Sequence, residues 1–306
     1  MELELKKKYY ERLTLPYVDK ENNQRLFIDQ YLQGSGSELE SKFWSENSSS
    51  RLAFDLYSWI VNEPSVNIFQ FEMKLPGVIC SKRGPAGVPN MDVYIETTGD
   101  RIFIESKYTE SATLAYTKGE KPNLSKAYWD EHEYGGLQIY ERFYGQNNIA
   151  DEFSKFCKSI QEYIDKNKNK WKWFDVKQET CHLFGIIFYL LGGTKSDSNG
   201  FWCDPNLRHL DKKVHLYNII WGLEGDNFEI DEDSLPVYFE NRAKDLMNCV
   251  VPSVVFDYKI LTVNDLLENS NFYGLDFTKA KPYGLDCSLA DQMNKQYKRN
   301  IRRGGK

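Results

Sequence analysis

The sequence lacks any long apolar segment. Its longest apolar run, residues 184–191, is far shorter than the ~20 residues that a helix needs to cross a bilayer. Residues 1–10 are charged from residue 2 onward and lack the apolar block of a secretory signal. We therefore expect a protein without a membrane segment and a cytoplasmic location.

Excess positive charge and paired cysteines are also missing. The chain has 39 Lys and Arg against 45 Asp and Glu, a net charge of −6. This balance excludes a uniformly basic nucleic-acid-binding surface, although it allows a local basic groove. The 6 cysteines are scattered and form no CxxC motif, so neither a disulfide framework nor a structural zinc site is predicted. We expect reduced thiols.

What the sequence does contain is enough apolar material for a large core. Hydrophobic residues make up 41% of the 306 residues and aromatic residues 15%, and no internal repeat or clear linker is visible. We predict one α/β domain over residues 1–306. Helical periodicity is found at 38–44, 51–61, 134–166, 236–249 and 263–269. Strand patterns are found at 68–75, 91–96, 101–107, 182–191, 214–223 and 254–258.

Two of these strands carry a group of charged residues that can act together. Residues 97–100 (Thr-Thr-Gly-Asp) are typical of a hairpin turn between strands 91–96 and 101–107. Glu105 and Lys107 are two residues apart and therefore share one face of their strand. If the hairpin pairs in this way, Asp92 can lie across from them on the neighbouring strand.

Two carboxylates and one ammonium group at one place suggest metal-assisted hydrolysis. Carboxylate oxygens are ligands that suit Mg²⁺. A Mg²⁺ ion there would polarise a phosphodiester and lower the pKa of water bound to it, and Lys107 could orient that water. The alternative is an exposed hairpin with Glu–Lys pairs on its solvent face. The apolar residues 102–104 that precede Glu105 favour a core strand instead.

The segment from residue 89 to residue 107 resembles the PD-(D/E)xK nuclease superfamily, which has the restriction-endonuclease-like fold. The residues that carry the resemblance are Pro89, Asp92, Glu105, Ser106 and Lys107. Two residues separate Pro89 from Asp92, whereas the two are adjacent in the family motif. The run from residue 36 to residue 50 also resembles a bacterial group of predicted restriction endonucleases in this superfamily.

The resemblance implies a fold and a set of roles. The implied core has the order α-β-β-β-α-β over about residues 35–192, with a mixed central sheet flanked by helices. Beyond this core, the pattern of elements in the sequence predicts a C-terminal α/β elaboration over residues 193–306, which ends in a basic tail at 295–306. Asp92 and Glu105 would bind Mg²⁺, with Mn²⁺ as a substitute. The Ser106 carbonyl would be a further ligand, and Lys107 would serve the attacking water.

Two further catalytic positions follow from the same resemblance. Some members place a Glu on the first helix, which points to Glu38, with Glu40 as the second choice; a surface glutamate at a helix start is the alternative. Others place a Gln on the helix after the catalytic strands, which points to Gln138. Arg142 would share a helix face with Gln138, although a solvated face also explains that spacing.

The implied function is that of a Mg²⁺-dependent deoxyribonuclease of bacterial or phage origin, acting in restriction or defence. DNA would be the partner, and a homodimer is the expectation for cutting both strands of a duplex. Two other functions stay open: an end-dependent exonuclease or repair nuclease with the same fold, and a nucleic-acid-binding protein without turnover. RNA also stays open as a substrate.

Overall fold

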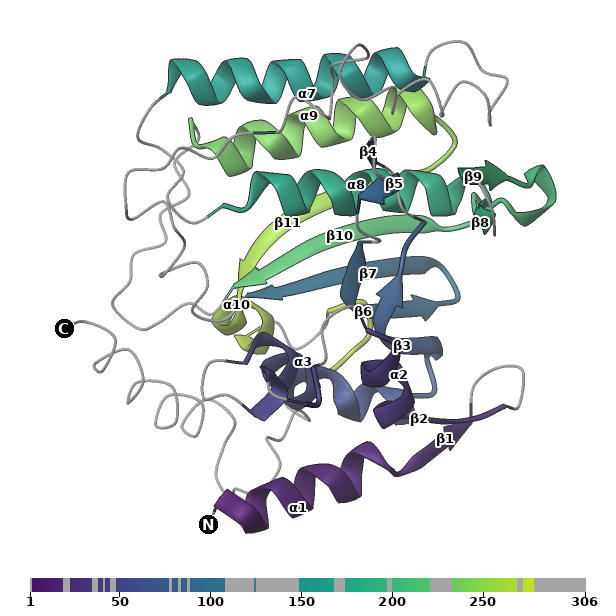
Figure 1. The fold of residues 1–306 in the computed structure, drawn as a ribbon, viewed down its shortest axis with the longest axis vertical. Coiled ribbons are helices and arrows are strands. Elements are labelled where there is room, and N and C mark those ends of the chain that lie inside the picture. Colours follow the sequence, from purple (N-terminus) through teal and green to yellow (C-terminus); the bar gives the residue numbers. More distant parts are fainter. Residues whose placement is uncertain are drawn as a thin grey trace.

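The protein is an α/β structure in which helices cover both faces of a mixed sheet (Figure 1). The computed structural model describes residues 2–18, 23–34, 38–40, 42–44, 48–76, 79–81, 84–86, 89–107, 124, 149–167, 174–196, 200–220, 233–268 and 272–277. The predicted fold class is thereby confirmed at the level of an α/β protein with a mixed, helix-flanked sheet.

The main sheet has five strands in the order β11-β10-β7-β6-β3. Its strands are β3 (Val66–Lys74), β6 (Asn90–Thr97), β7 (Asp100–Lys107), β10 (Lys213–Ile220) and β11 (Phe256–Thr262). The first three pair antiparallel, whereas β7 pairs with β10, and β10 with β11, in parallel. The five strands of this sheet come from between residues 66 and 262, so the sheet includes part of the segment predicted as a C-terminal elaboration.

The turn between β6 and β7 forms as its sequence predicts. Thr97 ends β6 and Asp100 begins β7, so Thr98 and Gly99 form a two-residue connection. The Thr97 hydroxyl oxygen accepts hydrogen bonds from the backbone N–H groups of Gly99 (3.3 Å) and Asp100 (3.1 Å). This turn fixes the register Glu96↔Arg101 to Val93↔Ile104, and the register decides which residues meet at the far end of the hairpin.

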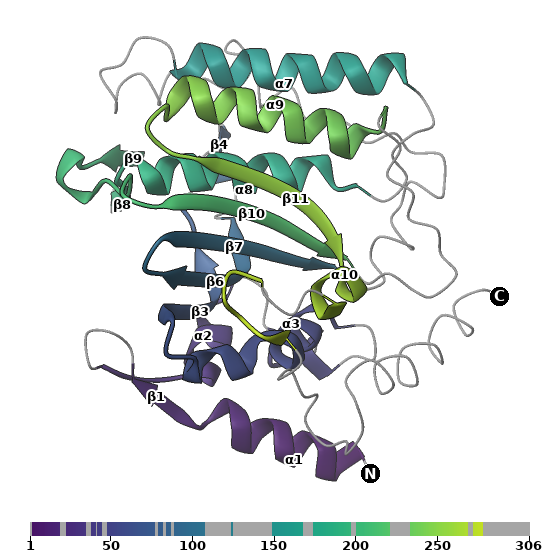
Figure 2. The same ribbon diagram turned by 180° about the vertical axis from the view of Figure 1, so that it is seen from behind.

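Two separate apolar cores lie on the two faces of the sheet. In both views, one set of helices lies at one end of the long axis and another set at the opposite end, with the sheet between them (Figures 1 and 2). The first set is α7 (Ile149–Lys166), α8 (Val176–Leu190) and α9 (Leu235–Val250). The second set is α1 (Glu2–Leu13), α2 (Phe27–Gln33) and α3 (Ser49–Tyr57).

Shorter elements complete the described structure. Three small antiparallel hairpins are formed by β1 (Pro16–Val18) with β2 (Gln24–Leu26), β4 (Ile79–Ser81) with β5 (Gly84–Ala86), and β8 (Gly193–Ser196) with β9 (Gly200–Cys203). The remaining helices are η1 (Lys42–Trp44), η2 (Ser58–Asn62), η5 (Pro205–Leu207) and α10 (Val263–Glu268). No helix in the described ranges is long and apolar enough to cross a membrane.

The strand predicted at residues 182–191 is wrong, because these residues lie mostly in helix α8. The helix is capped by Asp175, whose side chain accepts a hydrogen bond from the backbone N–H of Gln178 (3.1 Å). Its residues from Leu183 to Phe188 are all buried, so the run is apolar on every side and shows no amphipathic period. Such a run cannot be distinguished from a buried strand by periodicity alone.

Other expected elements are confirmed or shortened. The helix predicted at 51–61 forms as α3 and η2, and the Ser48 hydroxyl caps it by accepting a hydrogen bond from the Arg51 backbone N–H (3.0 Å). The helix predicted at 38–44 is wrong in its first part, because residues 38–40 form a turn and only 42–44 form a 3₁₀ helix. The helix predicted at 134–166 is described from Ile149 onward.

Gly185 allows α8 to approach the strand ends closely. A Cβ atom at this position would lie 2.9 Å from both the Leu75 Cβ and the Pro89 Cγ. Leu75 and Pro89 are also joined by a backbone hydrogen bond of 2.9 Å, so they extend the pairing of β3 with β6. The missing side chain therefore lets α8 lie directly over the start of the strand that carries Asp92.

Candidate functional site

Asp92 and Glu105 meet at the open end of the β6–β7 hairpin. The backbone ladder runs as far as Val93↔Ile104, and Asp92 and Glu105 are the next residues outward. There the Asp92 Oδ2 accepts a hydrogen bond of 2.6 Å from the backbone N–H of Ser106. The Asp92 side chain thus takes the place of a backbone carbonyl as the acceptor for the Ser106 N–H. This hydrogen bond holds the Asp92 carboxylate against the segment of β7 that carries Glu105 and Lys107.

Glu105 and Lys107 form a closed group of hydrogen bonds with a residue of α8. The Lys107 ammonium donates to the Glu105 Oε1 (2.6 Å) and to the Gln178 Oε1 (2.6 Å), and the Gln178 amide nitrogen donates to the Glu105 Oε1 (2.7 Å). The Glu105 side chain is only 3% exposed, and the Lys107 side chain is 17% exposed. The ammonium group is therefore held in one position while it keeps access to solvent.

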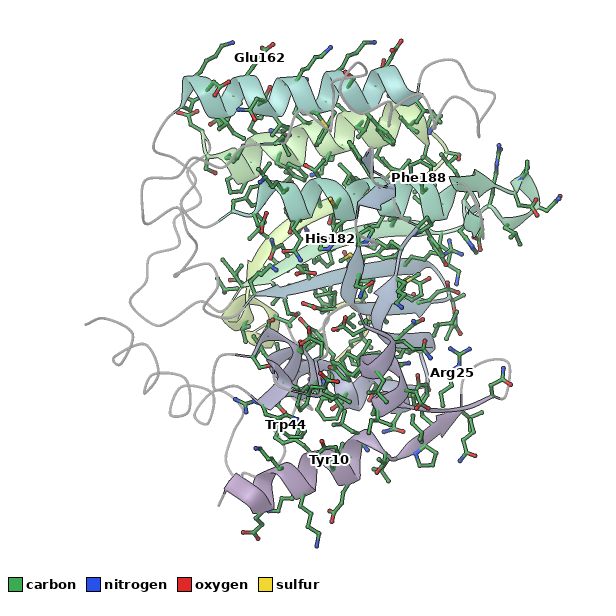
Figure 3. All side chains as sticks on the ribbon, viewed as in Figure 1. Tyr10, Arg25, Trp44, Glu162, His182 and Phe188 are labelled. Atoms are coloured by element: carbon green, nitrogen blue, oxygen red, sulfur yellow. The ribbon has the colours of Figure 1, made fainter. Side chains whose placement is uncertain are left out.

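Within the described part of the chain, the second carboxylate oxygen of Glu105 has no hydrogen bond. Glu105 Oε2 is buried and has no hydrogen-bond partner among the described residues. His182, one turn after Gln178 on the sheet side of α8 (Figure 3), places its Nε2 3.7 Å away, which is too far for a hydrogen bond. Burial lowers the pKa of His182, so this imidazole is neutral at neutral pH and supplies no positive charge to the oxygen.

The negative charges around Asp92 act on one another. Removal from water by the surrounding protein raises the pKa of Asp92 well above its usual value, and the nearby charges of Glu105 and Glu72 raise it further. The Lys107 charge and the Ser106 N–H act in the opposite direction. A positive charge placed between these carboxylates would favour the ionised form of Asp92.

Glu72 is an acidic residue of this region that the sequence analysis missed. It lies in β3 between the residue pairs Phe71↔Val93 and Met73↔Met91, which puts it level with Asp92. Its φ of 50° is in the left-handed region, and its exposed fraction is 8%. A non-glycine residue in this conformation costs about 1–3 kcal/mol. The sequence contains no signal for it, because residues 69–75 alternate strictly between apolar and polar and place Glu72 on the polar face of a regular strand.

Glu38 lies in the same part of the molecule but on another element. It is buried in the turn before η1, and its Oε2 accepts a hydrogen bond of 2.6 Å from the Ser50 hydroxyl of α3. The charges of Glu72, Asp92 and Glu38 all contribute to raising the pKa of the Tyr31 hydroxyl, after burial, which is the largest cause. Glu40, the second choice, is exposed. Gln138 and Arg142 lie outside the described residues.

Gln178 and His182 approach Glu105 from helix α8, and neither was predicted as a site residue from the sequence. Both belong to α8, which comes after α7 in the chain, and their spacing of four residues puts them on one side of the helix. The sequence contained this signal as Gln178-x-x-x-His182. The interpretation of residues 182–191 as a strand hid it, because a strand would separate these two side chains.

Comparisons with family models, with curated proteins and with solved structures found no match to this chain. Within the described ranges, no three His, Cys, Asp or Glu side chains are grouped closely enough to hold one metal ion together. Mg²⁺, however, keeps several waters and is usually bound by one or two carboxylates. The donors that fit this mode are the carboxylates of Asp92 and Glu105 and the carbonyl of Ser106.

Proposed function

We propose that the protein is a Mg²⁺-dependent deoxyribonuclease with a restriction-endonuclease-like core, which hydrolyses phosphodiester bonds of DNA in restriction or defence. The observation that carries this proposal is the meeting of Asp92, Glu105 and Lys107 at one end of β6 and β7. The order of elements along the chain also supports it. Helix α3 precedes the antiparallel strands β3, β6 and β7, and helices α7 and α8 connect β7 to the parallel strand β10.

The donor set fits a hard divalent cation. Glu105 Oε2 is buried without a hydrogen bond among the described residues, and a buried charged oxygen in this condition is unfavourable unless a cation or a donor reaches it. Asp92 and the Ser106 carbonyl supply further oxygen ligands of the kind that Mg²⁺ or Mn²⁺ binds. When bound, the cation would polarise the scissile phosphate and lower the pKa of the attacking water.

The protein's own groups would orient and stabilise the reacting atoms. Lys107 is held by Glu105 and Gln178 at 2.6 Å from an oxygen of each, so its ammonium is positioned before any substrate arrives. In this place it can orient the attacking water and offset negative charge that develops on the phosphate. Gln178 fixes both partners with one amide group, and this rigidity reduces the reorganisation that the reaction requires.

Parallel digestion of a circular and a linear plasmid tests the function. With Mg²⁺ or Mn²⁺ we expect both substrates to be cut, and we expect EDTA to stop the reaction. Cutting of the linear form alone would indicate an end-dependent exonuclease or repair nuclease. Binding of DNA without any cleavage would contradict the proposal and favour a nucleic-acid-binding protein, and an RNA substrate in a further arm identifies a ribonuclease.

Thermal unfolding with divalent cations tests the metal site without any activity. We expect Ca²⁺ and Mg²⁺ to raise the melting temperature, because a ligand that binds only the folded state at about 100 times its Kd stabilises it by about 2.7 kcal/mol. Ca²⁺ should bind without supporting cleavage. The variant Glu105→Gln should lose the cation effect. Glu240→Gln, which alters a Glu–Lys pair on α9, should keep it, and a cation effect that survives Glu105→Gln would contradict the assigned ligand.

A further inference from the structure

Glu179 is a fully buried acid beside the candidate site that the proposed chemistry does not use. It follows Gln178 on α8 and is 0% exposed. Its Oε1 accepts a hydrogen bond of 2.8 Å from the Asn218 side-chain amide, and its Oε2 accepts one of 3.1 Å from the Tyr258 hydroxyl. One carboxyl group thus connects α8 to both β10 and β11.

The two partners of Glu179 are placed by the same sheet that carries the site. Asn218 pairs in register with Glu105 across the parallel β7–β10 ladder. Tyr258 pairs with Leu216 across the β10–β11 ladder. The hydrogen bonds of Glu179 therefore fix the position of α8 relative to two strands of the sheet. One of the bonded residues, Asn218, is the direct neighbour of the proposed metal ligand Glu105.

An acid at this position is not what packing alone would favour. Burial raises the pKa of Glu179 to about 8, and the charge of Glu105 contributes to the rise, while Lys107 opposes it. The group is therefore mostly uncharged at neutral pH, and it adds little repulsion to Glu105. An apolar side chain of similar size would avoid the desolvation of a carboxyl group, so the two directional hydrogen bonds need another explanation.

We propose that Glu179 is a positioning residue that fixes the first turn of α8 on β10 and β11, so that Gln178 holds Lys107 and Glu105 in their reactive arrangement. Apolar packing between a helix and a sheet tolerates small shifts and rotations, whereas hydrogen bonds to two strands define one placement. Gln178 is the adjacent residue, and a shift of α8 would move its amide away from both partners. The catalytic part of this inference rests on the proposed deoxyribonuclease activity.

Three variants test this positioning role. Glu179→Leu removes both hydrogen bonds at similar volume. Glu179→Gln keeps an acceptor and adds an N–H group, which can donate to the Asn218 Oδ1, an atom that has no partner among the described residues. Ile187→Val is the matched control, because it trims a buried residue two turns further along α8 and is expected to destabilise the protein by about 0.5–1.5 kcal/mol.

Hydrogen–deuterium exchange and steady-state kinetics give independent readouts. We expect Glu179→Leu to speed amide exchange in residues 178–182 and to lower kcat for DNA cleavage by about tenfold or more, with KM unchanged, since small misplacements of catalytic groups have effects of this order. Glu179→Gln should restore slow exchange and most of kcat, and Ile187→Val should leave kcat unchanged. Wild-type exchange in Glu179→Leu, or a failure of Glu179→Gln to rescue, would overturn the inference.

The exchange experiment separates this inference from the proposed function. If no form of the protein cleaves DNA, the deoxyribonuclease proposal fails, while faster exchange confined to Glu179→Leu would still show that Glu179 positions α8. If the wild type cleaves DNA and Glu179→Leu cleaves it equally fast, the activity stands and the positioning role is wrong.

Discussion

Replacing Asp92 with Asn is expected to abolish Mg²⁺-dependent DNA cleavage and, at the same time, to raise the melting temperature of the metal-free protein. Loss of a metal-binding carboxylate removes several kcal/mol of transition-state stabilisation, which corresponds to a rate lower by about a thousandfold or more. The amide oxygen of Asn can still accept the hydrogen bond from Ser106, so the fold is retained. Cleavage rates and thermal unfolding in EDTA measure the two effects.

The gain in stability has a defined dependence on pH. Because the folded protein raises the pKa of Asp92, an ionised Asp92 destabilises the metal-free fold, and this penalty sets in as the pH rises above the unfolded pKa of about 3.9 and reaches its full size at the folded pKa. The difference between Asp92→Asn and the wild type should therefore vanish in acid, widen as the pH rises above about 4, and stay constant above the folded pKa of Asp92. An increase of about 2–4 °C would correspond to roughly 1 kcal/mol.

Asp257→Asn is a control for which we expect the opposite effect on the melting temperature. Burial acts to raise the pKa of Asp257, but the nearby His215 ring, the charge of Lys259 and a hydrogen bond of 3.1 Å from the Tyr217 hydroxyl outweigh it and lower the pKa to about 2. The ionised form thus stabilises the fold at neutral pH by about 1–2 kcal/mol, and this contribution is lost as the pH falls toward 2. Asp257→Asn should lower the melting temperature and leave cleavage intact.

For the Asp92→Asn variant itself, a stabilised protein that still cleaves DNA would contradict the proposed role of Asp92 as a metal ligand.

Replacing Lys107 with Met is expected to lower cleavage by about a hundredfold to ten-thousandfold, the range for loss of a positioned acid–base group. Divalent cations should still bind. Because Met removes the positive partner of Glu105, a bound cation becomes the main counter-charge at this carboxylate. We therefore expect Mg²⁺ or Ca²⁺ to raise the melting temperature of Lys107→Met by more than it raises that of the wild type.

Lys212→Met provides the matched control at the other end of the hairpin. Lys212 also forms a buried pair with a glutamate, at 2.8 Å from the Glu96 Oε1, and its side chain is 10% exposed. Loss of one partner of a buried ion pair is strongly destabilising, by about 3–5 kcal/mol in other proteins. Lys212→Met should therefore lose stability but keep the turnover of its folded fraction. Equal loss of turnover in both variants would assign the effect of Lys107 to stability alone.

The sequence predicted the hairpin and its residues because their structure is set locally. Strict alternation at residues 91–96 and 101–107 and a two-residue turn between them leave one register in which apolar residues face a core. That register places Asp92 beside Glu105 and puts Glu105 and Lys107 on one face. No long-range information was needed for these three residues.

The helix side of the site depended on long-range packing and was missed. Residues 182–191 are apolar because α8 is covered on every side, and the pattern of a fully covered helix has no visible period. The contact of Gln178 with Lys107 joins residues 71 positions apart, so nothing local predicts it. Glu72 was missed for another reason, since its left-handed backbone conformation breaks the alternation on which strand faces are assigned.

The most direct test is a crystal structure of the protein with Mn²⁺, located by its anomalous scattering. We expect one ion at about 2.0–2.2 Å from carboxylate oxygens of Asp92 and Glu105 and from the carbonyl oxygen of Ser106. An ion that contacts neither carboxylate, or a site that stays empty at saturating Mn²⁺ while DNA is cleaved, would contradict a shared cation at the end of β6 and β7.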